Sequence, residues 1–139
     1  MKRLIFTLLY NEGNYVLSRN FRHQNIGDIN WLLENYNLPE VTRGLDELMI
    51  INVSRKHKNY NQFVNDINII AKKCFIPLSV GGGITDMNIA DIYFKNGADK
   101  ILVNTSSYKN NNLLSSLTST YGRANIIAGV DYSYNRLKK

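Results

Sequence analysis

Short apolar runs alternate with longer amphipathic segments along the chain. Five runs are mostly apolar and rich in Ile, Leu or Val: residues 3–9, 47–52, 76–80, 100–104 and 126–131. Consecutive branched apolar residues in runs this short are typical of strands that are buried on both faces. The pattern therefore predicts five strands.

Four segments between these runs carry apolar residues at the three- and four-residue spacing of a helix. The clearest covers residues 60–73 and ends at Lys72-Lys73, where cations are favourable because they face the C-terminal end of the helix dipole. Residues 87–95 and 113–121 are each followed closely by a glycine, which is a common helix stop. A weaker helix is predicted over residues 28–36, with Asp28 as its N-cap.

The order of these elements predicts an α/β fold. Strands two to five begin at residues 47, 76, 100 and 126, so each connection has room for one helix. Such units form a parallel sheet with right-handed crossovers, either as a doubly wound open sheet or as a (β/α) barrel. One departure is Asn11-Glu12-Gly13-Asn14, which is followed by Tyr15-Val16-Leu17 and predicts a small hairpin after strand one.

The composition is that of one globular domain. The chain has 139 residues, of which 44% are apolar, and no apolar run approaches the ~18 residues of a membrane span. Cys74 is the single cysteine, which excludes an intramolecular disulfide and a cysteine-built metal site. We expect a cytoplasmic protein that binds no membrane, and no residue pattern points to a metal or another cofactor.

The chain is basic, with 17 Lys and Arg against 11 Asp and Glu and a net charge of +6. This excess suits nucleic acid, an acidic partner or a phosphorylated substrate. The basic residues fall in separate segments and are not interleaved with aromatic residues, as they are in platforms for single-stranded nucleic acid. Nucleic acid is therefore the less favoured partner.

A glycine run, Gly81-Gly82-Gly83, stands directly after the third strand and before a helix. Three glycines let the backbone approach a ligand and present N–H groups to an anion near a helix N-terminus. Asn104-Thr105-Ser106 follows the next strand and would open at the same edge of the sheet. The alternatives are a tight strand-to-helix turn and a helix-capping loop, but the two loops together favour a phosphate site.

Several short motifs, taken in their order along the chain, resemble those of a known family. Residues 45–48, 80–84, 97–100, 103–105 and 129–131 resemble, in order and spacing, the cyclase subunit of imidazole glycerol phosphate synthase, an enzyme of histidine biosynthesis. The resemblance covers the whole chain but only the first half and the fifth strand of that family's barrel. It implies a partial (β/α)8 TIM-type barrel over residues 1–139, with about four βα units plus a fifth strand.

The resemblance also implies site residues. The family's phosphate ligands match Gly82, Gly83, Asn104 and Thr105. Of the two aspartates that act as general acid and base in the family, the one at strand five matches Asp131. The alternative for that residue is a polar strand end that faces solvent.

Three positions depart from the family pattern, and we expect them on one face. The strand-one aspartate is Leu9, an aspartate near the end of strand two is Asn52, and a lysine after strand one is Leu17. Losing a general acid or base typically costs a factor of ~10² to 10⁴ in rate. The resemblance therefore implies a family member whose cyclase chemistry is in doubt.

The opposite ends of the strands keep residues with which the family guards an ammonia tunnel. Arg3, Glu47 and Lys100 match three of the four gate positions, and Asp99 matches a position that faces the glutaminase partner. Charges that point into a barrel are costly unless paired, so these side chains indicate a mutually compensating ring. The alternative is a solvated residue at the start of each strand.

Three functions stay open. The first is a cyclase homologue that binds a phosphorylated ribonucleotide and takes ammonia from a glutaminase, with Asp131 as its acid or base. The second is a non-catalytic ammonia conduit, because a family branch with an aliphatic residue at the position of Leu9 is associated with sugar amidotransferases of surface polysaccharide biosynthesis. The third is an incomplete, inactive half barrel, since the chain stops soon after the fifth strand. Unpaired outer strands would make such a fragment self-associate.

Overall fold

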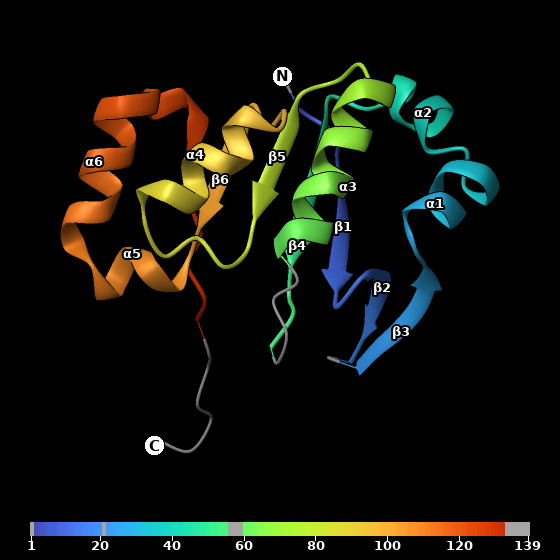
Figure 1. The fold of residues 1–139 in the computed structure, drawn as a ribbon, viewed down its shortest axis with the longest axis horizontal. Coiled ribbons are helices and arrows are strands. Elements are labelled where there is room, and N and C mark those ends of the chain that lie inside the picture. Colours follow the sequence, from blue (N-terminus) through green and yellow to red (C-terminus); the bar gives the residue numbers. More distant parts are fainter. Residues whose placement is uncertain (1, 21, 56–59, 133–139) are drawn as a thin grey trace.

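The protein is built on one seven-stranded sheet. The computed structural model describes residues 2–20, 22–55 and 60–132, and its strand order is β3-β2-β1-β4-β5-β6-β7. The strands are β1 (Ile5–Asn11), β2 (Asn14–Arg19), β3 (Arg22–Gly27), β4 (Glu47–Asn52), β5 (Leu78–Gly81), β6 (Lys100–Val103) and β7 (Ile126–Ala128). Strands β1 and β4 to β7 are parallel, and their carboxyl ends lie along the lower edge in Figure 1.

The helices are α1 (Ile29–Asn35), α2 (Leu38–Val41), α3 (Tyr60–Lys73), α4 (Met87–Lys95), α5 (Thr105–Lys109) and α6 (Asn111–Tyr121), with short 3₁₀ turns η1 (Thr42–Gly44) and η2 (Arg123–Asn125). The five predicted strands and the four predicted helices are all present. Helices α2 and α5 are additional. Asp28 and Asp86 cap α1 and α4 by accepting backbone N–H groups from the first turn of each helix.

The predicted hairpin is confirmed, and it extends into a three-stranded meander. Strand β2 pairs antiparallel with β1, and β3 pairs antiparallel with β2. Strand β3 was not predicted because it is mostly polar and exposed. Its last residue, Gly27, is tightly covered by α1, since a Cβ at Gly27 would lie 2.7 Å from the Trp31 side chain.

The core lies between one face of the sheet and helices α3, α4 and α6. Alternate strand residues point into it because successive side chains of a strand face opposite sides. The strands contribute Leu8, Tyr10, Tyr15, Leu48, Ile50, Leu78, Val80, Ile101 and Val103 to this core, and helices α3, α4 and α6 contribute Phe63, Ile67, Ile70, Ala90, Tyr93, Leu113 and Leu117. Ile29 and Leu32 of α1 and Leu38 of α2 extend it.

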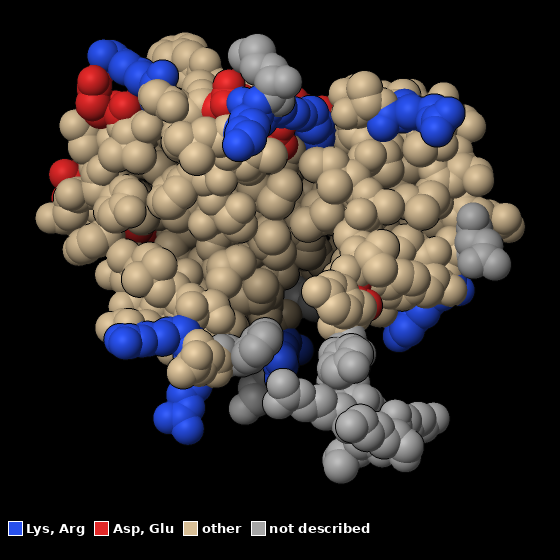
Figure 2. Space-filling view, turned by 180° about the vertical axis from the view of Figure 1, so that it is seen from behind, with Lys and Arg blue, Asp and Glu red and all other residues tan. Residues whose placement is uncertain are grey.

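We call the other side of the sheet the open face. It carries the alternate strand residues Thr7, Leu9, Met49, Ile51 and Leu102, which are only partly buried or exposed. Figure 2 shows this side of the molecule, where the centre lacks charged side chains and positive and negative residues gather at the upper edge. The upper edge is where the parallel strands begin.

Helix placement and strand order distinguish the two architectures that the sequence left open. A doubly wound sheet reverses its strand order at a switch point and carries helices on both faces. Here β1, β4, β5, β6 and β7 follow one another in chain order, and the core helices cover one face. The α/β fold is therefore confirmed, and it agrees with part of a (β/α)8 barrel. Residues 133–139, on which the expectation of an incomplete chain partly rested, lie outside the described residues.

Candidate functional site

The glycine run forms a loop in which two positions require glycine. Gly82 and Gly83 have φ angles of +93° and +71°, and a Cβ at Gly82 would lie only 2.1 Å from the carbonyl oxygen of Asn52. The hydroxyl of the buried Tyr93 donates to the Gly82 carbonyl at 3.1 Å, and the Tyr60 hydroxyl donates to the Gly83 carbonyl at 3.4 Å. The loop is thus held from the helix side, and it presents bare backbone to the other side.

The loop after β6 is hydrogen-bonded to the segment that follows β7. The Asn104 side-chain amide donates to the Asp131 carboxylate at 2.8 Å. The Tyr108 hydroxyl donates to the Asn104 side-chain oxygen at 2.7 Å and lies 3.1 Å from the Gly129 carbonyl, while the Asp131 backbone N–H donates to it at 3.2 Å. One phenol on α5 therefore joins both strand ends.

These two loops meet around one hollow, which we call the glycine-loop cavity. It has a volume of about 660 Å³ and opens at the carboxyl ends of the parallel strands. The structure brings together all five residues expected at this edge, since the lining includes Gly82, Gly83, Asn104, Thr105 and Asp131. Two of the altered positions, Leu9 and Asn52, line it as well.

Asn52 is the most constrained polar residue of this lining. Its side chain is 7% exposed, and its side-chain oxygen accepts the Ser54 backbone N–H at 3.0 Å. Its side-chain nitrogen Nδ2 has no hydrogen-bond partner among the described residues. Such an unpaired buried donor costs about 1 to 3 kcal/mol, and its burial leaves it out of reach of a ligand in the cavity.

The third altered position, Leu17, does not join Leu9 and Asn52 at the glycine-loop cavity. Leu9 is in register with Val16, and successive residues of a strand point to opposite sides, so Leu17 points to the other side of the sheet from Leu9. Leu17 is also 58% exposed. The expectation that the three altered positions lie together is therefore wrong for Leu17.

Two further polar residues of the cavity, Thr85 and Lys109, were missed in the sequence. Ser106, which the sequence placed in the loop after the fourth strand, lines it as well. Lys109 lies four residues after Thr105, one helical turn along α5, so it returns to the same side of that helix. The only signal in the sequence was this spacing, and it depends on recognising a helix of five residues.

At the opposite edge of the sheet, the three gate candidates form one ion cluster around Glu47. The Glu47 side chain is 1% exposed and pairs with Arg3 and Lys100, the latter at 2.7 Å. The Ser79 hydroxyl donates to the second carboxylate oxygen. Burial raises the pKa of the Glu47 carboxyl, but the hydrogen bonds from Lys100, Ser79 and Arg3 outweigh it and hold that pKa below its usual value.

Asp99 lies beside this cluster and takes no part in its ion pairs. It links the segment before β6 to the first residue of β5 through two hydrogen bonds. Its carboxylate accepts the Leu78 backbone N–H at 2.8 Å, and its own N–H donates to the Leu78 carbonyl at 2.8 Å. Asp46 makes the same two bonds with Leu4, at 2.6 Å and 3.0 Å. Asp99 is exposed at this edge, so its carboxylate remains accessible to a partner.

The described ranges hold neither a metal-binding cluster nor a membrane-spanning helix. No group of three or more His, Cys, Asp or Glu there is arranged to hold a metal ion. Within the same ranges, no helix combines the length and the apolar character needed to cross a membrane.

A family model described as histidine biosynthesis protein matches residues 4–139. A protein of Parasynechococcus marenigrum, provisionally named imidazole glycerol phosphate synthase subunit hisF2, is 39% identical over 134 residues, which are 96% of this chain and 50% of that protein.

Proteins named imidazole glycerol phosphate synthase subunit HisF are similar over the same region. The one from Flavobacterium johnsoniae is 34% identical over 94% of this chain and 51% of its own length, and the one from Pyrococcus furiosus is 26% identical over 96% and 52%. The chain thus spans about half the length of the curated relatives it matches.

Proposed function

The chain belongs to the family of histidine biosynthesis proteins, and from this premise we propose that it binds a phosphorylated ribonucleotide-type ligand in the glycine-loop cavity and receives ammonia from a glutaminase at the opposite edge of the sheet. We propose further that the ring-closing cyclase reaction is lost. Each part of this proposal rests on a different group of residues.

Phosphate binding is supported most directly by the backbone of Gly82 and Gly83, which line the cavity together with Asn104 and Thr105. Both glycines have positive φ angles, and a Cβ at Gly82 would clash with the Asn52 carbonyl, so no side chain shields this backbone. The glycine backbone can approach an anion closely, and the Thr105 hydroxyl stands at the first turn of α5. Lys109 supplies a positive charge to the same cavity.

The loss of ring closure follows from the carboxylates of the cavity. Asp131 lines it and accepts a hydrogen bond from Asn104, so one acid or base can act there. The matching position on β1 is Leu9, whose aliphatic side chain cannot carry a proton. Chemistry that needs two carboxylates is therefore expected to fall by a factor of ~10² or more.

Ammonia delivery is supported by the cluster around Glu47. It holds two cations, Arg3 and Lys100, against one buried carboxylate at the edge where the strands begin. A net positive cluster repels ammonium and admits neutral ammonia. Beyond it, the centre of the open face is uncharged (Figure 2), as a path for a neutral molecule requires.

We also propose that residues 1–139 supply the first half of a (β/α)8 barrel. Among the described residues, strand β7 and the meander strand β3 are the two edges of the sheet, and the core helices pack on one of its faces. A second set of βα units placed on the open face would pair the edge at β7 and enclose the cavity.

A second candidate function is favoured by Leu9 together with the intact Glu47 cluster. Losing the acid or base while keeping the ammonia gate fits a protein that only conducts ammonia. The acceptor would then be a substrate of a separate sugar amidotransferase, and the glycine-loop cavity would serve to anchor a phosphate group.

Phosphate binding can be tested by titrating the ¹⁵N-labelled chain with inorganic phosphate and following the backbone amide signals. The signals of Gly82, Gly83 and Thr105 should shift saturably, and Lys109→Gln should weaken binding by about five- to tenfold. Lys72→Gln, an exposed lysine at the end of α3, serves as the matched control. Shifts spread evenly over the surface lysines would contradict the proposed phosphate site.

Ring closure and ammonia delivery need separate assays. With ammonia and the aminated ribonucleotide as substrate, the protein should release no imidazole glycerol phosphate, and measurable turnover would overturn the proposed loss. The protein should also stimulate glutamine hydrolysis by the glutaminase subunit of an imidazole glycerol phosphate synthase. Glu47→Gln should abolish this stimulation. A chain that neither binds phosphate nor stimulates a glutaminase would be an inactive fragment.

A further inference from the structure

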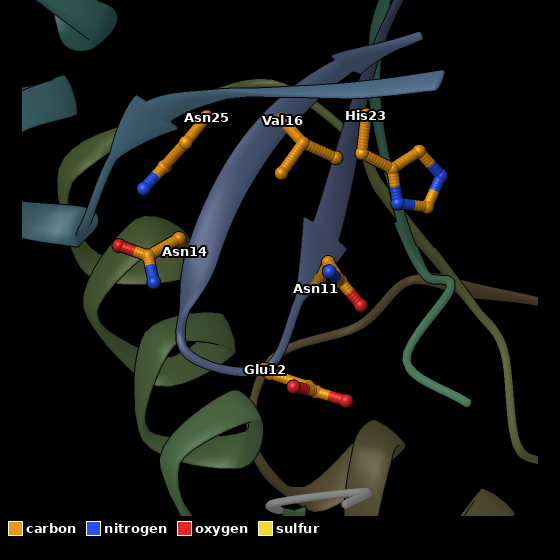
Figure 3. Close-up of a pocket in the computed structure, with 6 residues that line it drawn as sticks. All are labelled: Asn11, Glu12, Asn14, Val16, His23 and Asn25. Atoms are coloured by element: carbon orange, nitrogen blue, oxygen red, sulfur yellow. The ribbon is translucent and has the colours of Figure 1, made fainter. Parts of the chain in front are cut away.

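A second hollow lies on the meander of β1, β2 and β3. It has a volume of about 220 Å³ and is lined by Asn11, Glu12, Asn14, Val16, His23 and Asn25. Figure 3 shows the side chains of Asn14 and Asn25 on one side of Val16 and those of Asn11 and His23 on the other. We call this the amide hollow.

Strand register places these side chains on one face of the sheet. Asn11 is in register with Asn14, and Val16 is in register with Asn25. Residues in register, and residues two positions apart on one strand, share a face of the sheet. His23, two residues before Asn25, therefore joins the same face.

The chemistry of the amide hollow suits hydroxyl groups. Each asparagine offers two N–H donors and a carbonyl acceptor, and the imidazole of His23 adds two ring nitrogens that can form hydrogen bonds. Among the described residues, no hydrogen bond ties the side chains of Asn11, Asn14, His23 or Asn25 to a neighbour. Glu12 is the one charged residue of the lining, although the chain carries a net charge of +6. A phosphate group would find no cation here.

The amide hollow adjoins the glycine-loop cavity on one face of the sheet. Leu9 lines that cavity, and its register partner Val16 lines the amide hollow, so a single pair of apolar residues separates the two. Hydrogen-bonding groups around an apolar centre are the usual arrangement of a site for a polar organic ring.

We propose that the amide hollow is a binding site for a neutral polyhydroxylated ring, that is, for the sugar part of a ligand. The side-chain amides of Asn11, Asn14 and Asn25 exchange hydrogen bonds with the ring hydroxyls, and Val16 packs against the apolar face of the ring. This site does not depend on the proposed phosphate binding, because none of its six lining residues lines the glycine-loop cavity.

The test is a titration of the full ¹⁵N-labelled chain with D-glucose, with inorganic phosphate as a separate probe. Glucose should shift the side-chain amide signals of Asn11, Asn14 and Asn25 saturably, while phosphate leaves these three unchanged. Asn25→Ala should weaken glucose binding by about five- to tenfold, because a neutral hydrogen-bonding side chain is removed. Asn25 is exposed on β3, so this change should leave the fold intact.

Gln24→Ala is the matched control, because Gln24 neighbours Asn25 and alternation turns it to the other face. This variant should bind glucose like the wild type. Glucose shifts that do not saturate, or that are equally strong in Asn25→Ala, would overturn the proposal. If phosphate causes no signal shifts but glucose still binds, the result counts against the proposed phosphate binding alone. Failure of the sugar site and failure of the proposed function are therefore distinguishable.

Discussion

Asp66 of α3 is a carboxyl group held inside the core at the meander. It is 1% exposed and accepts a hydrogen bond from the Tyr15 hydroxyl at 3.2 Å. Burial raises its pKa to about 6, and the charge of Asp28 adds to the shift, while the Tyr15 bond opposes it. The neighbouring Tyr10 hydroxyl has no partner among the described residues, and burial together with the charge of Asp66 raises its pKa to about 12. This cluster therefore resists carrying charge.

Asp66→Asn should stabilise the protein at pH 7. Because the folded pKa lies above the usual value of 3.8, the folded state binds the proton more tightly than the unfolded state does. Wild-type stability should then fall as pH rises from about 4 to about 6, whereas the variant should be insensitive to pH there. At pH 7 urea unfolding should show a gain of about 1 to 2 kcal/mol. Asp91→Asn, on the exposed side of α4, should change stability by less than about 0.5 kcal/mol, and an equal gain in both variants would contradict the assignment.

Tyr108→Phe should weaken phosphate binding without unfolding the protein. The hydroxyl bonds to the Asn104 side chain and to the Asp131 backbone N–H, so its loss removes two of the bonds that hold these residues, while the direct bond from Asn104 to Asp131 remains. Phosphate affinity, measured by calorimetry, should fall by about three- to tenfold. Tyr108 is 53% exposed, so the melting temperature should change little. Tyr36→Phe, also at an exposed tyrosine, should bind phosphate normally, and a Tyr108→Phe protein that does so too would show that the bridge is unimportant.

Among the elements, the loop after β5 is fixed by backbone shape. The close approach of Gly82 to the Asn52 carbonyl leaves no space for a side chain, and its positive φ is costly for other residues. Two control glycines separate these causes. Gly122 has a φ of +87° with nothing near its Cβ position, and Gly44 has neither constraint.

Substitution by alanine should therefore rank the three glycines by cost. Gly82→Ala should lose about 3 kcal/mol in urea unfolding, since strain and a clash combine. Gly122→Ala should lose about 1 kcal/mol from strain alone, and Gly44→Ala should change little. Equal losses at Gly82 and Gly122 would show that the contact with Asn52 is not limiting.

The Glu47 cluster ties together the starts of four strands. Glu47→Gln leaves Arg3 and Lys100 without a counter-charge, and it should cost about 2 kcal/mol at pH 7. Because the folded pKa of Glu47 is lowered, its stabilisation is present above the usual value of 4.5 and is lost as pH falls through the folded value. Unfolding curves of variant and wild type should thus converge once pH falls below the folded pKa of Glu47. The exposed pair Glu40–Arg43 gives the control, where Glu40→Gln should cost less than about 0.5 kcal/mol.

The elements show what the sequence could predict. The five parallel strands and helices α1, α3, α4 and α6 were predictable because their apolar periodicity reflects burial in one core. Strand β3 has no such signal, since it is held by pairing with β2 and not by burial. The short helix α5 was missed because it has no buried apolar residue to give a periodic pattern. Tyr108 and Lys109 were missed with it, since their positions in the site depend on helical spacing.

At the scale of the whole molecule, the main feature is a sheet with one covered face and one open face. The family resemblance found in the sequence is confirmed, and the chain matches about half the length of its relatives. Thr7, in the middle part of β1, lies on the open face and is exposed. An apolar face and two strand edges without neighbours favour association with a second sheet.

We therefore expect the isolated chain to self-associate through the open face. Sedimentation at tens of micromolar should give species larger than a monomer, and Thr7→Lys should shift them toward the monomer, because a buried lysine would lack a counter-charge. The control variant Thr120→Lys, at an exposed position of α6, should associate like the wild type. A monomer at every concentration, or equal effects of both variants, would contradict association through this face.

The packing of Trp31 against the last residue of β3 has a practical consequence. The chain contains one tryptophan beside nine tyrosines, so excitation at the red edge of the ultraviolet band selects a single indole. Its emission is a native optical reporter of the place where the meander meets α1, and it needs no dye or engineered label. Detachment of that segment during unfolding can therefore be timed separately from the collapse of the main core.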